Sequence, residues 1–103
     1  MKLLIVAAIK DYSKQVSALL KKTNIPVFSI LDAVGVKNNL DLNLADDWFG
    51  RGVGEFDSVF VISFTTDDYI EKVFKEIELF NESEAGAFPI RAFVLPVDKS
   101  LSK

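Results

Sequence analysis

The heptapeptide "SVFVISF", residues 58–64, decides the fold because it is apolar at nearly every position. A strand with one solvent-exposed side normally alternates apolar and polar residues. Here three residues point to each side: Val59, Val61 and Ser63 to one, and Phe60, Ile62 and Phe64 to the other. Both sides of this predicted strand are therefore largely apolar and both need cover.

Three further segments have the length and composition of strands. Leu3–Ile9 and Pro89–Val97 are mostly apolar runs, and Val27–Val34 is rich in Val, Ile and Phe, with Gly35 expected to end it. The last of the four repeats the pattern of "SVFVISF", since apolar residues again occur at both odd and even positions. The chain therefore predicts four strands.

Two segments have the spacing of amphipathic helices. The first places Tyr12, Val16, Leu19 and Leu20 on one face, and the second has an apolar stripe of Ile70, Val73, Phe74, Ile77 and Phe80. Asp11 or Ser13 is expected to cap the first helix, and Asn24 to mark its end. Thr65 or Thr66 is expected to cap the second.

The order of elements is β, α, β, long loop, β, α, β in one domain, residues 1–103. Right-handed crossovers place both helices on the same face of one four-stranded antiparallel sheet. This is an α+β, ferredoxin-like βαββαβ fold. Its other sheet face lacks helices, yet its side chains are apolar, and monomers rarely expose a large apolar patch. We expect either the long loop or other copies of the chain in a closed ring to cover it.

Composition excludes several functions. The chain has a net charge of −3, no Cys and no His, so it lacks clustered cations for nucleic acid, thiolate chemistry and the commonest general base and metal ligand. No apolar run approaches the ~20 residues that span a bilayer. We therefore expect a cytoplasmic protein with no nucleic-acid partner, no direct membrane insertion, no catalytic residues and no metal.

The stretches "MKLLIVAAI", "LDAVGVKNN" and "IRAFVLPVDKSL" resemble the PII signal-transduction proteins over nearly the whole chain in element order and spacing. The resemblance implies a homotrimer whose sheets face inward. It also implies a long T-loop between the second and third strands that engages target proteins, often membrane transporters or enzymes. Residues 36–56 occupy that place, and a connector of this length is otherwise disordered or misassigned.

The resemblance further implies an adenine nucleotide site between subunits. Gly35 matches the first glycine of the family's G-x-G turn, but Lys37 replaces the second, and Asn38 follows. The family's phosphate-binding G-D-G-K aligns with residues 88–91, where only Arg91 keeps a matching charge. The tail "DKSLSK" lacks the family's arginine pair. Gly35, Lys37, Asn38 and Arg91 are thus the ligand candidates, for an adenine nucleotide, another small ligand or none.

Within the long loop, "NLADDWFG" has the caps of a short helix that would present Trp48 and Phe49. An exposed Trp often anchors a protein interface, so Trp48, Phe49 and Arg51 are the partner candidates. The alternatives are aromatic rings folded onto the sheet or a neighbouring subunit, and a solvated arginine. Asp46 and Asp47 are interpreted as a solvated turn and not as a metal site.

The leading hypothesis is a non-enzymatic, trimeric PII-like regulatory protein. It would sense a small metabolite in intersubunit clefts and act on a target through residues 36–56. The alternatives are a ligand-free ferredoxin-like oligomerisation module, whose loop packs the oligomer, and an ACT-like amino-acid sensor. An acylphosphatase-like enzyme comes last because no phosphate-cradling loop is evident in the sequence.

Overall fold

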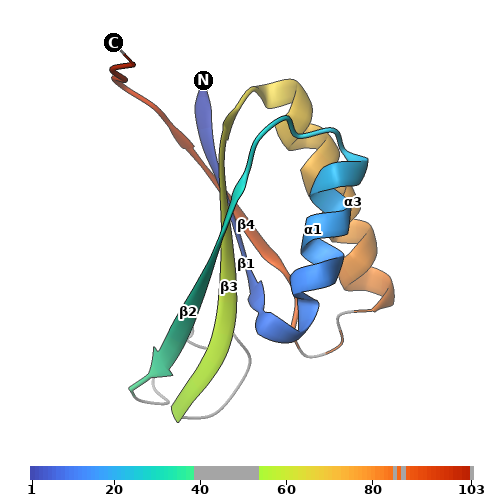
Figure 1. Ribbon diagram of the computed structural model, residues 1–103. Coiled ribbons are helices and arrows are strands. Elements are labelled where there is room, and N and C mark those ends of the chain that lie inside the picture. The colour runs from blue at the N-terminus through green and yellow to red at the C-terminus, as the bar shows by residue number, and fades with distance from the viewer. Residues whose placement is uncertain (39–53, 85, 87, 103) are drawn as a thin grey trace.

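The computed structural model describes residues 1–38, 54–84, 86 and 88–102. Its described elements in chain order are β1 (Lys2–Ile9), η1 (Lys10–Tyr12), α1 (Ser13–Lys22), β2 (Ser29–Lys37), β3 (Gly54–Thr65), α3 (Asp67–Ser83) and β4 (Arg91–Pro96). The strands form one antiparallel sheet in the order β2-β3-β1-β4. Both helices lie on the same side of that sheet (Figure 1). The predicted α+β, ferredoxin-like arrangement is confirmed.

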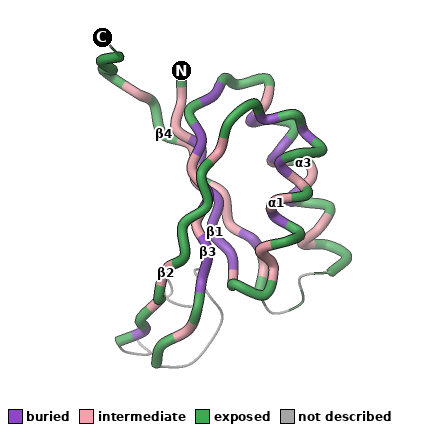
Figure 2. Tube along the Cα trace, in the orientation of Figure 1, coloured by how far each residue is buried: buried purple, intermediate pink, exposed green. Residues whose placement is uncertain are grey.

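The core lies between the two helices and the sheet, and buried residues follow β1, β3 and the inner sides of the helices (Figure 2). Its members include Leu4, Val6, Ala8, Val59 and Val61 from the strands and Val16, Leu20, Ile70, Val73 and Ile77 from the helices. In the register, Val6 lies opposite Val61 on β3 and Ala92 on β4. The predicted division of β3 and β4 into two faces is therefore correct.

The helices occupy the predicted segments, but no side-chain cap bond forms at either N-cap position. The turn Lys10–Tyr12 precedes α1, and Ser13 donates its hydroxyl to the carbonyl of Lys10 at 2.6 Å. Thr66 does occupy the N-cap position of α3. Asn24 ends α1 as predicted, because its φ of 62° is left-handed and cannot continue a helix.

The β2–β3 pair is longer than the sequence indicates. Gly35 does not end β2, which continues to Lys37, and β3 already begins at Gly54. The reason is a continuous ladder, in which Gly35 pairs with Phe56 and Lys37 pairs with Gly54. Both ends of the predicted loop, residues 36–56, are therefore strand.

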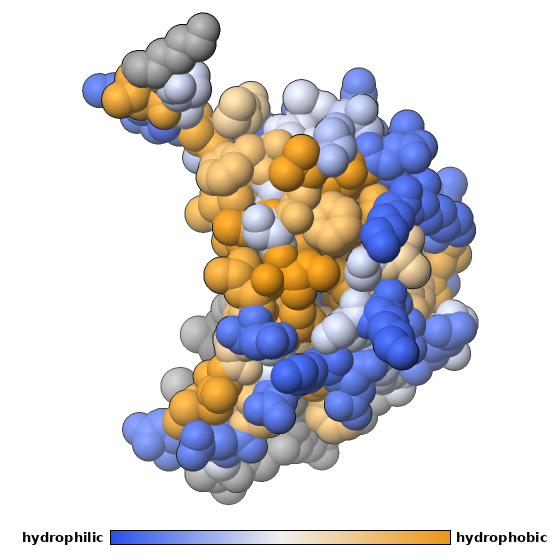
Figure 3. Space-filling model, in the orientation of Figure 1, coloured by the Kyte–Doolittle hydropathy of each residue, from blue (hydrophilic) through white to orange (hydrophobic). Residues whose placement is uncertain are grey.

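The face of the sheet opposite the helices, called the open face below, is apolar across all four strands. Alternation from the register assigns to it Leu3, Ile5, Ala7, Ile9, Leu31, Ala33, Phe56, Phe60, Ile62, Phe64, Phe93 and Leu95. Phe64 is 60% exposed and Leu95 45% exposed. Hydrophobic surface extends along the flank away from the helices (Figure 3). Exposure is not uniform along this face, because Ala7 and Ser58 are buried and Lys37 is only 7% exposed. The exposed part is the end that carries Phe64 and Leu95.

Candidate functional site

Two of the four predicted ligand residues are cations on the open face. Lys37 ends β2, and Arg91 begins β4, where it pairs with Ala7. Because β2 and β4 run in opposite directions, the end of one and the start of the other lie at the same end of the sheet. The two strands are the opposite edges of the sheet. Lys37 and Arg91 therefore lie at the same end and on the same face of the sheet, but on opposite edges.

Both cations have a buried nitrogen with no acceptor in the part of the chain that the structure describes. Lys37 is only 7% exposed, and no hydrogen-bond partner contacts its Nζ among the residues that the structure describes. The Nε of half-buried Arg91 is likewise buried and unpartnered within that part of the chain. A buried charge without a partner is costly, whereas one that meets an opposite charge and hydrogen bonds is tolerated. This arrangement can therefore accept an anion.

A single chain does not bring the two cations together. Arg91 lies in one row across the sheet with Ala7, Phe60 and Leu31. Lys37 is six positions beyond Leu31 on β2, or ~20 Å along the strand. The two edge strands are a further ~14 Å apart across the sheet, which is three strand spacings. One small anion cannot bridge them within one copy.

Gly35 has a structural role that involves no ligand. A Cβ atom at this position would overlap the ring of Phe56, its partner on β3. Among the described residues, a positive φ occurs at Asn24, Gly54 and Gly86, and Gly35 is not one of them. Asn38, the fourth ligand candidate, is exposed directly after β2. Gly35 and Asn38 therefore lie beside Lys37 in sequence, on the edge of the sheet far from Arg91.

The residues before Arg91 are held by a contact that sequence reasoning missed. Asn81 on α3 accepts a hydrogen bond from the backbone N–H of Ile90 at 2.8 Å, and its amide donates to the carbonyl of Ile90 at 2.9 Å. Both backbone groups of Ile90 are thus occupied, and Pro89 has no N–H to donate. This segment cannot cradle a phosphate with backbone donors at these two residues. In the sequence, the one indication of this contact is an Asn directly after Phe80, at the end of the apolar stripe.

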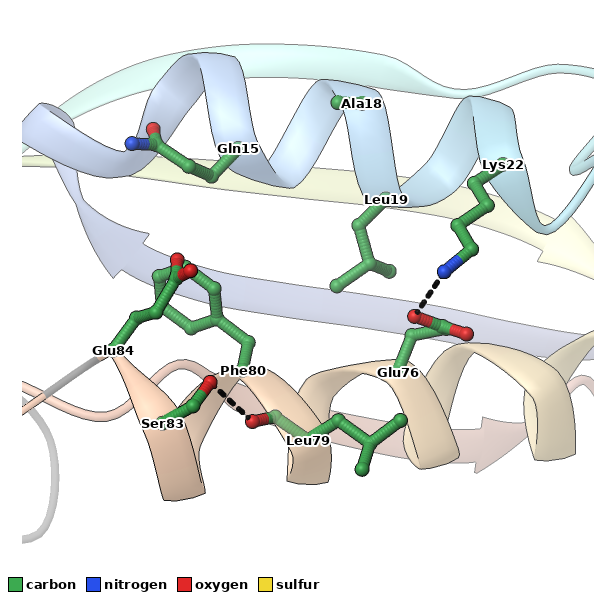
Figure 4. Close-up of a pocket in the computed structure, with 9 residues that line it drawn as sticks. All are labelled: Gln15, Ala18, Leu19, Lys22, Glu76, Leu79, Phe80, Ser83 and Glu84. Carbon is green, nitrogen blue, oxygen red and sulfur yellow. Dashed lines mark hydrogen bonds and ion pairs between the residues drawn. The ribbon is translucent and has the colours of Figure 1, made fainter.

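A shallow groove of about 420 Å³ lies on the opposite side of the molecule, between α1 and α3 (Figure 4). Lys22 reaches across it to Glu76, with 3.1 Å between Nζ and Oε2. Leu79 borders the groove and is 50% exposed. Within the described residues, no cluster of three or more acidic side chains could hold a metal ion. The hydroxyl of Ser83, which also lines the groove, donates to the carbonyl of Leu79 at 2.9 Å.

The partner candidates Trp48, Phe49 and Arg51 lie outside the described residues, as do Asp46 and Asp47. The predicted short helix "NLADDWFG" falls there too. No helix in the described parts of the chain is both long and apolar enough to cross a membrane.

Neither a comparison with protein-family models nor one with characterised protein sequences finds a match. The fold, however, is similar to that of two solved structures. One is described as a PII-like signaling protein from Thermus thermophilus, with a TM-score of 0.60 and 14% identity over 91% of this chain and 83% of that one.

The other is CPII from Thiomonas intermedia, a nitrogen regulatory PII-like protein solved with ADP, AMP and bicarbonate. It has a TM-score of 0.57 and 12% identity over 97% of this chain and 94% of that one. Both likenesses extend over nearly the full length of each chain, and the sheet order and helix placement agree with the fold expected from the resemblance. This chain therefore has the fold of the PII-like signalling proteins.

Proposed function

We propose that this protein is a non-enzymatic, PII-like regulator that assembles as a homotrimer and senses a small anionic metabolite between its copies. The amine of Lys37, which is buried on an apolar sheet face and has no partner among the described residues, carries the proposal. A cation in such a place needs an anion, and an apolar face of this extent needs a protein surface. The edge positions of Lys37 and Arg91 suit a site shared by two copies.

The ligand we favour carries an oxyanion, and an adenine nucleotide is the first compound to test. One structural neighbour was solved with ADP, AMP and bicarbonate, which guides the choice of probes for this chain. Gly35, Lys37, Asn38 and Arg91 would form the ligand site in the assembled protein, with no metal required. Ligand binding would shift residues 36–56 toward the loop conformation that makes the better contacts with the ligand. Trp48, Phe49 and Arg51 would then contact the target, such as a cytoplasmic enzyme or a membrane transporter.

A ligand-free oligomerisation module is the second candidate. Two observations favour it: the ring of Phe56 explains Gly35 without a ligand, and Asn81 occupies the backbone of Ile90. In such a module, the open face would only hold copies together.

Thermal unfolding distinguishes the metabolite sensor from the oligomerisation module. ATP, ADP, AMP, bicarbonate and amino acids are added separately. A ligand at 100 times its dissociation constant stabilises the folded state by about 2.7 kcal/mol, which raises the midpoint by several degrees. We expect one of the oxyanion ligands to raise the midpoint of the wild type and not that of Lys37→Met.

Lys14→Met is the matched control, because Lys14 is an exposed cation on α1. It should respond as the wild type does. If none of these compounds shifts the wild-type midpoint, the sensor proposal fails and the module is favoured.

A further inference from the structure

The groove between α1 and α3 combines an apolar interior with two carboxylates. Leu19 of α1 points toward α3, and Phe80 of α3 points toward α1; both side chains are half-buried (Figure 4). Glu76 and Glu84 also line the groove, and their carboxylates point toward α1 (Figure 4). Leu79 borders the groove but points away from α1 (Figure 4). The interior can therefore hold an apolar side chain beside two negative charges.

The groove residues of α3 lie on one face of the helix at regular spacing. Glu76, Phe80 and Glu84 follow one another every four residues, which places an aromatic ring between two carboxylates that are about 12 Å apart. Glu84 forms no ion pair within the described residues, and one carboxylate oxygen of Glu76, Oε2, lies 3.1 Å from the Nζ of Lys22. A carboxylate accepts several hydrogen bonds, so Glu76 can receive a second cation. The groove thus has the pattern anion, apolar, anion along its length.

The segment after β4 carries the complementary pattern. Residues 97–102 are neither helix nor strand, and Leu101 is 91% exposed, more than any other large apolar side chain in the described residues. Lys99 and Lys103 flank Leu101, each two positions away in the sequence. In an extended segment, every second side chain points to the same side, and residues four positions apart are separated by ~13 Å. This pattern of cation, apolar, cation matches the groove in order and in spacing.

We propose that residues 98–103 of one copy dock in extended form in the α1–α3 groove of a second copy. Leu101 packs inside the groove, and the two flanking lysines pair with Glu76 and Glu84. In Figure 1 the segment after β4 points away from the helices of its own chain, so the groove that it fills belongs to another copy. The groove lies on the helix side of the sheet. The contact therefore uses neither the open face nor the candidate ligand residues.

Cross-linking between two single-cysteine chains tests this contact, because the chain contains no Cys of its own. Ser102→Cys with an affinity tag is mixed with untagged Ala18→Cys, since Ala18 lines the groove, and a short bis-maleimide is added. Docking holds the two sulfurs at an effective concentration far above that of the protein, so we expect about tenfold more mixed dimer than with Glu78→Cys. Glu78 is the control because it is exposed on α3 but does not line the groove. Equal yields from Ala18→Cys and Glu78→Cys would overturn the inference.

Substitutions in both chains test the side chains that make the contact. Leu101→Ser in the tagged chain should reduce the yield to that of the Glu78→Cys control, and a residue that is 91% exposed can be replaced without disturbing the core. Glu84→Lys in the groove chain should lower the yield about two- to fivefold, in line with the loss of one exposed ion pair. Lys99→Glu or Lys103→Glu in the tagged chain should then restore it, depending on the direction in which the segment lies. A full yield from Leu101→Ser, or no rescue by either lysine variant, would overturn the inference.

This contact and the proposed function can fail separately. A mixed dimer formed by a protein whose thermal midpoint responds to none of the ligands would support docking of the segment and contradict metabolite sensing. A midpoint that responds to a ligand, without the mixed dimer, would support sensing and overturn docking. Circular dichroism confirms that each variant is folded.

Discussion

Gly35 is required by the ring of Phe56, which lies across from it on β3 and occupies the place of a side chain. The pair stands two positions before Lys37, at the end of the open face where we place the ligand. A ring packed over a glycine keeps the ladder regular without a bulge, so the strand continues through Gly35. The same residue that resembles a phosphate-binding glycine thus has a packing role.

Gly35→Ala tests this packing. Because the new methyl group must displace the ring, we expect a loss of about 1–3 kcal/mol in the free energy of unfolding, measured with urea. In a Phe56→Ala background the same change should cost little, since the ring is gone. An equal cost in both backgrounds would show that the ring is not the reason for the glycine.

At the scale of elements, Asn81 joins α3 to the start of β4. Its carboxamide accepts from the N–H and donates to the carbonyl of Ile90, as a neighbouring strand would. Ile90 itself is 2% exposed and belongs to the core, and Arg91 follows it directly. The position of the cation on the sheet edge therefore depends on a helix side chain nine residues earlier in the chain.

Asn81→Leu removes both bonds and leaves the half-buried N–H of Ile90 without its acceptor. An unsatisfied buried donor costs about 1–3 kcal/mol, so the midpoint of urea unfolding should fall by a corresponding amount. The control is Ser83→Ala, because the exposed hydroxyl of Ser83 bonds only to Leu79 of its own helix at 2.9 Å. Equal midpoints for the two variants would contradict a role for Asn81 in holding β4.

For the whole molecule, one face of the sheet is covered by helices, and the other is apolar and exposed at the end that carries Phe64 and Leu95. Phe64 is 60% exposed, and its cross-strand neighbour Leu3 lies opposite Leu95, which is 45% exposed. On the helix-facing side, the apolar residues of β1 and β3 pack beneath α1 and α3, whereas Ile30, Val34 and Val36 of the edge strand β2 are exposed. Phe64 and Leu95 lie on the open face, where we expect a second copy.

Phe64→Glu places a charge in this face. The carboxylate would be desolvated in an assembly but solvated in a single chain. We therefore expect the assembly to dissociate into folded single chains. Light scattering should give a lower molar mass for the variant at the same concentration, with an unchanged circular dichroism spectrum. Leu79→Glu is the matched control, since Leu79 is 50% exposed on the opposite side of the molecule. A wild-type mass that already equals one chain would contradict the trimer.

Sequence periodicity predicted the four strands, the two helices and, for the last two strands, the side of the sheet to which each residue points. These properties depend on local spacing, because a period of two or 3.6 residues assigns each side chain to a face whatever the rest of the chain does. The apolar pattern of "SVFVISF" likewise predicted that both faces of the sheet are apolar. Thr66 occupies a predicted N-cap position, but neither Asp11 nor Ser13 is the N-cap of α1, because several nearby polar residues can each begin a helix and backbone geometry selects among them.

The extent of the β2–β3 ladder, the contact of Asn81 with Ile90 and the burial of Lys37 and Arg91 became evident in the folded chain alone. Each depends on residues distant in sequence: Gly35 stays in a strand because Phe56 pairs with it, and Lys37 is buried without an acceptor among the described residues. The spacing of residues along the chain does not indicate which strand lies beside which residue. Local spacing therefore defined the layers and faces of this protein, and contacts between distant residues defined where a charge is buried without an acceptor among the described residues.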